Sequence, residues 1–119
     1  MLLNDFFEII EIHNTSVKVI SKIKLNLTHK IFLGHFPNNP ITPGVVLIQI
    51  VKEILENCCN KELQLIKMSR CKFLKILNPN ETPIVIVHIN ISVIENIIKA
   101  DAFGRENENI FFKLSAVYQ

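Results

Sequence analysis

The sequence feature that most constrains the fold is a nearly continuous apolar segment at residues 44–57. Thr42 and Pro43 before it are typical of a helix start, because a threonine hydroxyl can cap a free backbone N–H and proline at the first helical position loses no hydrogen bond. Apolar side chains cover most of the helical circumference, and the polar ones recur with helical spacing: Gln49, Lys52, Glu53 and Glu56. We therefore predict a largely buried helix at residues 44–57, which needs a sheet to cover it.

The rest of the chain supplies strands for such a sheet. Segments rich in β-branched and aromatic residues predict strands at residues 7–13, 16–25, 63–74, 84–94, 97–103 and 110–118. Polar residues predict a hairpin at Asn14 and Thr15 and turns at residues 78–80 and 104–109. Two strands, a helix and four strands predict an α+β fold, in which an antiparallel β-sheet is wrapped around a long central α-helix.

Length and composition agree with one globular domain at residues 1–119. The chain is 49% hydrophobic and 20% charged, which excludes a disordered chain. Its apolar runs are far shorter than the roughly 20 residues of a membrane-spanning helix, so we predict no membrane span. The first residues lack the pattern of a secretory signal, and a cytoplasmic location is expected.

Cysteines and net charge exclude two further classes of protein. Cys58, Cys59 and Cys71 are odd in number and form no CxxC pair, so neither a disulfide framework nor a zinc or other metal site is expected. The formal charge of +2 is too small to indicate a nucleic-acid partner.

A second informative feature is the segment before the helix. Residues 30–43 hold three of the five prolines and one of the three glycines, which predicts an irregular but well-specified loop. Loops of this kind often carry functional residues, because a rigid scaffold presents them at the surface. Residues 30–43 are therefore candidates for a functional loop.

The loop and the helix start form a recognisable motif. Residues 34–46 read Gly-His-Phe-Pro-Asn-Asn-Pro-Ile-Thr-Pro-Gly-Val-Val. This run closely resembles the GHFPxxPxxPGV motif of β-hydroxyacyl-(acyl carrier protein) dehydratases, and residues 71–81 and 99–104 look more weakly like later segments of that family. The resemblance implies the hot-dog fold, elimination of water from a (3R)-hydroxyacyl thioester and no dissociable cofactor.

The resemblance also assigns roles to individual residues. It makes His35 the base near C2 of the substrate, and a neutral imidazole suits that task near pH 7. It assigns the backbone N–H of Gly44 to the thioester carbonyl. Gly44 lies at the predicted helix N-terminus, where free N–H groups and the helix dipole favour negative charge on an oxygen. Phe36, Pro43 and Val45 complete the expected substrate-binding residues.

One position departs from the family pattern. Fourteen residues after His35 the family carries a glutamate or aspartate that reaches into the partner subunit's site, but this chain has Gln49. An acid can protonate the departing 3-hydroxyl, whereas an amide only forms hydrogen bonds or holds a water. Our hypothesis is that Gln49 positions the hydroxyl or a water while His35 takes the C2 proton and returns it to the hydroxyl.

Two alternatives concern the same helix. Glu53 lies one turn beyond Gln49 and is a candidate replacement acid, although a turn is about 5.4 Å. Gln49 could instead belong to a polar stripe that only faces solvent.

Partners and competing functions remain open at this stage. We expect a homodimer or higher homo-oligomer and an acyl carrier protein that carries the thioester. The basic residues near the family's later segment are candidates for docking it, or else form a solvated strand edge: Lys67, Arg70, Lys72 and Lys75. The alternatives to a dehydratase are a non-catalytic acyl-thioester-binding or partner subunit, which Gln49 favours, and a thioesterase or isomerase, which the loop resembles less.

Overall fold

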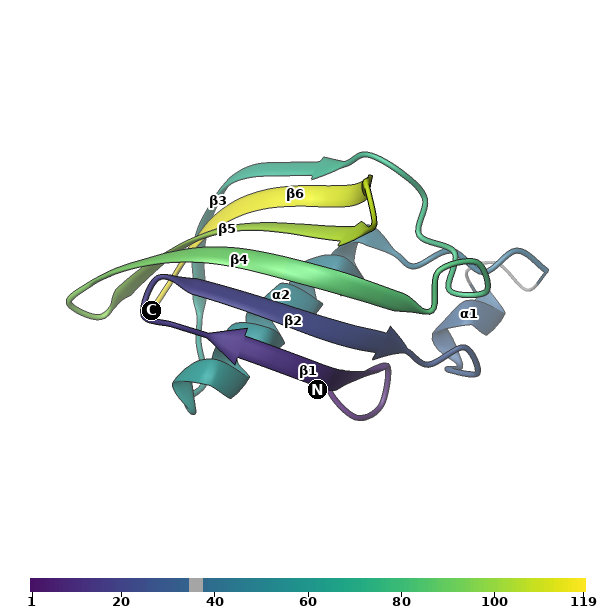
Figure 1. Cartoon of the computed structure of the whole chain (residues 1–119), viewed down its shortest axis with the longest axis horizontal. Helices are drawn as coiled ribbons and strands as arrows, with labels where there is room; N and C mark the ends of the chain where they lie inside the picture. The colour runs from purple at the N-terminus through teal and green to yellow at the C-terminus, as the bar shows by residue number, and fades with distance from the viewer. Residues whose placement is uncertain (35–37) are drawn as a thin grey trace.

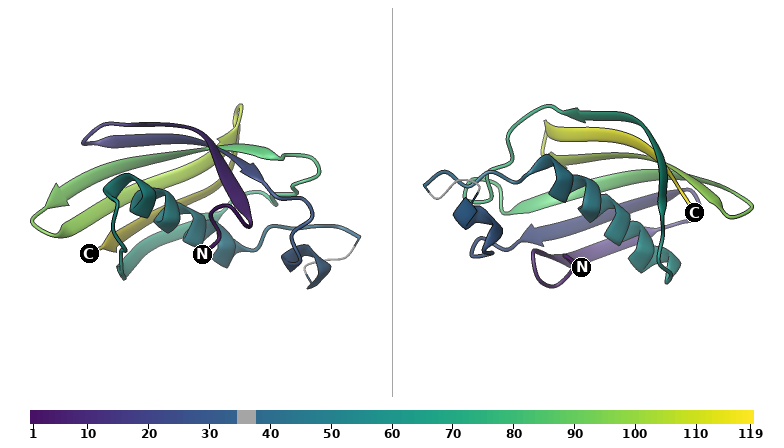
Figure 2. Two further views of the ribbon diagram at one scale, coloured as in Figure 1. Left: turned by 90° about the horizontal axis from the view of Figure 1, so that it is seen from below. Right: turned by 180° about the vertical axis from the view of Figure 1, so that it is seen from behind.

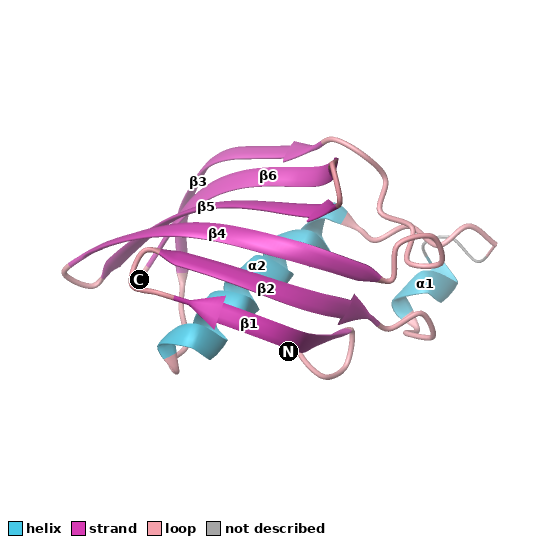
Figure 3. Cartoon of the chain, in the orientation of Figure 1, coloured by secondary structure: helices cyan, strands magenta, loops and turns pink. Residues whose placement is uncertain are grey.

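The computed structural model describes residues 1–34 and 38–119. Six strands form one antiparallel sheet in the order β1-β2-β4-β5-β6-β3, and helix α2 crosses its concave face (Figures 1 and 2). In chain order the elements are β1 (Phe7–Asn14), β2 (Lys18–Leu25), α1 (Ile31–Gly34), α2 (Gly44–Cys59), β3 (Leu65–Phe73), β4 (Ile84–Ile94), β5 (Ile97–Glu106) and β6 (Asn109–Tyr118). Two strands precede the helical part of the chain and four strands follow it, which is the order that the sequence predicts (Figure 3).

Helix α2 packs one side against the sheet. The buried apolar side chains of this helix are Val46, Leu47, Ile50, Val51, Ile54 and Leu55. Val45 points away from the sheet and is 72% exposed. The helix has sixteen residues, and the sheet covers it from one side. The predicted α+β arrangement with an antiparallel sheet is therefore confirmed, whereas the expectation of a long helix enclosed by the sheet holds only in part.

Strands β2, β4, β5 and β6 bury alternate residues over most of their length, as a sheet with one covered face requires. In β4, Val85, Val87 and Ile89 are at most 1% exposed and face the helix. Val93 belongs to the same predicted apolar face but is 55% exposed, because it lies near the β4–β5 turn. The apolar face of this strand is thus confirmed except near that turn.

Turn chemistry explains the hairpins. The predicted β1–β2 hairpin is confirmed, and the hydroxyl of Thr15 accepts hydrogen bonds from the N–H groups of Val17 and Lys18 at 3.2 and 3.1 Å. The turn expected at residues 104–109 is tighter, with Asn107 in the left-handed region at φ 54°. Gly104 instead lies within β5, where its missing side chain leaves room for the ring of Phe112.

Two local predictions before α2 were wrong. The loop expected at residues 30–43 contains the short helix α1. Thr42 does not cap α2: Pro43 precedes the first helical residue in an extended conformation, and there is no side-chain cap. Packing overrides the local preference, because Thr42 is 4% exposed and its N–H donates to the carbonyl of Leu77 at 2.9 Å.

No helix in the described parts of the chain combines the length and the apolar character needed to cross a membrane.

Tyr118 at the end of β6 generates a test of the packing. It is 1% exposed, and its hydroxyl has no hydrogen-bond partner among the described residues. Burial, helped by the charge of Glu56, raises the pKa of Tyr118 to about 12. An unfolded tyrosine ionises near pH 10, so between about pH 10 and 12 only the unfolded state gives up this proton.

The free energy of unfolding should therefore fall above about pH 10, by up to about 1.4 kcal/mol per pH unit from this group. Tyr118→Phe should show a shallower fall, measured by urea unfolding at several pH values. Equal slopes for the two proteins would contradict the burial of an un-ionised hydroxyl.

Candidate functional site

The predicted catalytic loop is described on both sides of its centre. Gly34 ends α1, whereas His35, Phe36 and Pro37 lie outside the described residues. The predicted base and one predicted substrate-binding residue therefore stay predictions.

Gly44 is the first residue of α2, and no carbonyl of the helix precedes it to accept its N–H. The start of the helix borders a pocket of about 300 Å³. One wall comes from the chain leading into α2 and the other from the end of β3 and the segment after it. The lining is mostly apolar and consists of Ile41, Thr42, Pro43, Gly44, Leu47, Phe73, Leu74, Lys75, Ile76 and Leu77. A backbone N–H beside an apolar pocket can bind a carbonyl oxygen while its acyl chain stays out of water.

Phe73 contacts Gly44 directly. A side-chain carbon added to Gly44 would meet the ring of Phe73 at 2.5 Å. The ring faces the helix because Phe73 pairs with the buried Phe112 of β6. Glycine is therefore needed here for close approach, first by Phe73 and also by any ligand of the N–H. Phe73 could not be identified from the sequence, because no local pattern places residue 73 opposite residue 44.

The structure brings only some of the predicted site residues together. Pro43 and Gly44 line the pocket, whereas Val45 is exposed and does not. Gln49 does not line it either, since it lies further along α2 on another side of the helix. Its side-chain Nε2 donates a hydrogen bond to Glu53 Oε2 at 2.8 Å.

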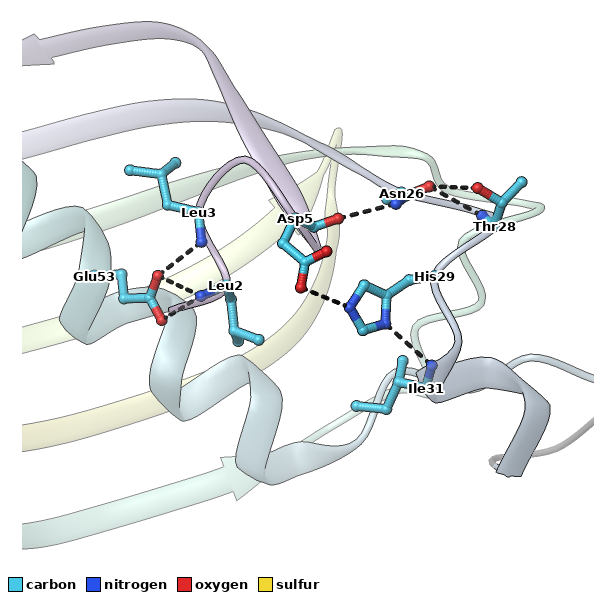
Figure 4. A network of polar contacts seen from close by, with 8 residues as sticks. All are labelled: Leu2, Leu3, Asp5, Asn26, Thr28, His29, Ile31 and Glu53. Carbon is cyan, nitrogen blue, oxygen red and sulfur yellow. Dashed lines mark hydrogen bonds and ion pairs between the residues drawn. The ribbon is translucent and has the colours of Figure 1, made fainter.

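Glu53 has a different environment from the one its sequence position suggests. It is 2% exposed, so the alternative that the polar stripe faces solvent is wrong for this residue. Its carboxylate accepts hydrogen bonds from the backbone N–H of Leu2 at 2.8 and 2.9 Å and of Leu3 at 2.8 Å (Figure 4). Together with Gln49, these donors occupy both oxygens. Glu53 thus fixes the N-terminal segment to α2, and its candidacy as a replacement acid loses support.

The same N-terminal segment also contacts His29, just before the predicted catalytic loop. Asp5 Oδ2 lies 3.1 Å from His29 Nε2, and His29 Nδ1 accepts the N–H of Ile31 at 3.0 Å at the beginning of α1 (Figure 4). Because Nδ1 is an acceptor, the proton of the neutral ring is on Nε2 and points to Asp5. The ring of His29 also packs edge-on against Phe6 at 5.2 Å. The N-terminal segment is therefore tied to both elements that flank the predicted site.

The basic residues singled out in the sequence lie mainly on the outer face of the sheet. Arg70 pairs with Ser115 of β6 and Lys72 with Lys113, so these side chains share the face that points away from α2. Lys67 lies on the same face, because it pairs with Val117 of β6. Val117 also pairs with Lys99 of β5, so Lys99 lies on this face as well. Lys75 follows β3, and its Nζ donates to Asn109 Oδ1 at 2.6 Å. We call the group Lys67, Arg70, Lys72, Lys99 and Lys113 the basic face.

His88 on this outer side of the sheet is a structural residue. Its Nε2 accepts a hydrogen bond from Arg105 Nε at 2.9 Å, and its ring stacks on Phe103 at 4.5 Å. Burial lowers the pKa of His88, and the charges of Arg105 and Lys18 lower it further. Within residues 1–34 and 38–119, no group of three or more histidine, cysteine or acidic side chains is placed to hold a metal ion.

Comparison with known proteins identifies the family. The sequence model of the ApeI-like family, described as ApeI dehydratase, matches residues 11–103. The chain therefore belongs to this dehydratase family, and the resemblance of its motif to β-hydroxyacyl-(acyl carrier protein) dehydratases is confirmed.

Curated relatives agree with this family. The 3-hydroxyacyl-[acyl-carrier-protein] dehydratase FabZ of Ehrlichia chaffeensis is 32% identical over 81 residues, which cover 64% of this chain and 55% of the relative. FabZ of Wolbachia pipientis wMel is also 32% identical over 81 residues, covering 62% and 55%. The chain spans about half the length of the curated relatives it matches.

Solved structures share the fold. The dehydratase heterocomplex ApeI:P from Xenorhabdus doucetiae aligns with a TM-score of 0.73 at 18% identity, covering 92% of this chain and 95% of that one. A putative thioesterase from Ralstonia eutropha aligns with a TM-score of 0.64 at 11% identity, covering 91% and 82%. At these identities the likeness shows the fold alone, which is hot-dog-like with a six-stranded antiparallel sheet.

The contact between Gly44 and Phe73 predicts the effect of a single methyl group. Gly44→Ala should lower the free energy of unfolding by about 1–3 kcal/mol, because the added carbon overpacks against the Phe73 ring. Gly34→Ala is the matched control, because a carbon added to Gly34 meets no heavy atom of the described residues within 4 Å, and it should stay within about 0.5 kcal/mol. Urea unfolding followed by circular dichroism measures both. The double variant with Gly44→Ala and Phe73→Ala should lose less free energy of unfolding than the sum of the losses in the two single variants. Strictly additive losses would contradict the contact.

Proposed function

We propose that this protein eliminates water from a (3R)-hydroxyacyl thioester carried by an acyl carrier protein, in fatty-acid or related acyl-chain biosynthesis. The observation that carries this function is the position of Gly44 at the start of α2, beside a mostly apolar pocket and nine residues after the motif histidine His35. The family of dehydratases to which the chain belongs supports it.

The proposed reaction uses few groups. The N–H of Gly44 donates to the thioester carbonyl and stabilises the negative charge that develops when His35 removes the C2 proton. The C3–O bond then breaks, a C2=C3 double bond forms, and His35 returns its proton to the departing hydroxyl, which leaves as water. Gln49 holds the hydroxyl and exchanges no proton. The acyl chain occupies the apolar pocket, with Leu47 and Leu77 in its walls.

A second copy of the chain completes the site in this proposal. Strand β3 is at the edge of the sheet, and its edge is open to pairing with another chain. Large apolar side chains are exposed on and near it: Leu65 at 40%, Ile66 at 49% and Phe73 at 51%. We infer a homodimer or higher homo-oligomer that covers these groups and Val45, and in which Gln49 serves the site of the second copy.

The basic face gives the carrier protein a place to dock. Its five basic side chains surround Asp101, an acidic residue of β5 on the same face of the sheet. The Asp101 carboxylate already accepts a hydrogen bond from the Ser115 hydroxyl. A surface with this excess of positive charge favours an acidic partner and speeds its association. We infer a cytoplasmic location as well, which the three free cysteines fit.

Gln49 also favours a second candidate function. A hot-dog subunit with an amide in place of the acid can bind an acyl thioester or complete the site of an active paralogue without turning over. The dehydratase ApeI:P among the structural neighbours is a heterocomplex, that is, an assembly of unlike subunits. Turnover by the purified protein alone distinguishes the two functions.

Removing the predicted base tests the dehydratase. His35→Ala should lower kcat/KM by about 10²–10⁴, with the enoyl thioester followed by absorbance and mass on 3-hydroxyacyl carrier-protein substrates. His13→Ala is the matched control, because the His13 side chain is 76% exposed on β1. Release of free acid would indicate a thioesterase. Substrate binding without turnover, unchanged by His35→Ala, would favour the non-catalytic subunit.

Restoring the acid tests Gln49. In Gln49→Glu the introduced carboxyl group lies beside the Glu53 carboxylate, and like-charge repulsion favours the protonated form of one of them near neutral pH. This is the state that a general acid needs, so we expect a several-fold rise in kcat. The rise should disappear at high pH, where both carboxyl groups are ionised. Gln49→Met, which keeps length but not hydrogen bonding, should lower kcat. If Gln49→Glu leaves rate and pH profile unchanged, Gln49 is outside the site.

A further inference from the structure

Glu53 is a buried charged residue that the proposed reaction does not use. Among the charged side chains in the described parts of the chain it alone is buried, at 2% exposed. Burying a carboxylate costs several kcal/mol unless hydrogen bonds compensate for the lost water. Glu53 lies in the middle of α2, one turn from Gln49. Its position therefore calls for a role beyond the packing of the helix.

Three backbone hydrogen bonds fix the Glu53 carboxylate. Oε1 accepts the N–H groups of Leu2 and Leu3, each at 2.8 Å, and Oε2 accepts the N–H of Leu2 at 2.9 Å. These donors belong to the N-terminal segment, which is itself held by the contact of Asp5 with His29 (Figure 4). The orientation of the carboxylate is thus set without Gln49, and the Gln49 amide has to adapt to it.

A carboxylate oxygen without a proton can only accept hydrogen bonds, whereas a side-chain amide has one accepting end and one donating end. The 2.8 Å contact with Glu53 Oε2 therefore turns the NH₂ end of Gln49 toward Glu53. The carbonyl oxygen of Gln49 lies at the other end of the amide, where no side chain or backbone group of residues 1–34 and 38–119 donates a hydrogen bond to it. Without Glu53, either end of the amide would be equally free to face outward.

We propose that Glu53 is a positioning residue that fixes the side-chain amide of Gln49, so that Gln49 offers its carbonyl oxygen to the substrate's 3-hydroxyl. This role builds on the proposed dehydratase function. A hydroxyl that donates to Gln49 keeps its oxygen lone pairs free to receive the proton returned by His35. An inverted amide would instead donate to that oxygen and compete with the proton. The arrangement selects acyl chains with a hydroxyl at C3 over saturated or enoyl chains, which have no donor there.

The orientation of the amide can be measured without activity. In the ¹⁵N-labelled wild-type protein, the Gln49 NH₂ signals are assigned by their absence in Gln49→Met. One of the two protons should be shifted downfield and protected from exchange with solvent, because it is hydrogen-bonded to a buried carboxylate. Glu53→Gln should remove this shift. Two protons at the shift of a free amide in the wild-type protein would overturn the proposal.

Kinetics test the consequence. In Glu53→Gln the introduced amide can keep its oxygen on the N–H groups of Leu2 and Leu3, and its NH₂ end then faces Gln49 and turns that amide around. We expect kcat/KM for the 3-hydroxyacyl substrate to fall about tenfold, with unchanged affinity for the enoyl product, at a temperature well below unfolding.

Glu56→Gln is the matched control. Glu56 lies on the same helix, and its carboxylate accepts the N–H of Leu63 at 2.8 Å, but it does not contact Gln49. This variant should lose stability as Glu53→Gln does while leaving the Gln49 signals and kcat/KM unchanged. Equal losses of kcat/KM in the two variants would show that Glu53 has only a structural role.

Failure of the two proposals can be told apart. A downfield Gln49 proton that depends on Glu53, in a protein without turnover, would retain the positioning role and reject the dehydratase. Turnover by a protein whose Gln49 amide is not hydrogen-bonded would retain the dehydratase and reject the positioning role. Should Glu53→Gln fail to fold, the wild-type spectrum alone decides the orientation.

Discussion

Burial of one side of α2 against the concave sheet is the interaction on which the rest of the structure depends. The helix carries six buried apolar side chains, and at about 25 cal/mol per Å² of apolar surface their burial outweighs the preferences of individual turns and caps. It also determines where the helix begins. Because the helix start lies between the segment from Ile41 and the end of β3, Gly44 comes to line an apolar pocket.

A second constraint acts at the middle of the same helix. Glu53 replaces its lost water with hydrogen bonds from the first residues of the chain and from Gln49. The N-terminal segment thereby packs beside α2, while Asp5 connects it to His29 at the start of α1. Elements that are distant in the sequence are thus held together around the predicted site. A polar network of this kind is sensitive to the loss of any one partner, since the others stay buried.

Much of the fold could be predicted from the sequence because the signals were periodic. The alternation in β4 and the helical spacing at residues 44–57 each indicate an apolar face that is buried in the fold. The predicted ends of the strands and of the helix differ from the observed ones by no more than three residues. Local rules failed where packing competed with them. Thr42 is a good cap in isolation, yet it is buried beside Leu77 and leaves α2 without a side-chain cap.

The candidate site shows the same difference between what local sequence patterns indicate and what packing decides. Its motif from Gly34 to Gly44 is contiguous, so the sequence by itself determined the dehydratase family and the place of the helix start. Only the tertiary structure decided that Phe73 lies against Gly44 and that Glu53 is buried under Leu2 and Leu3. These contacts join residues at least 29 positions apart, and no local periodicity records such a pairing. It arises when the sheet closes over the helix and brings the N-terminal segment and the end of β3 to it.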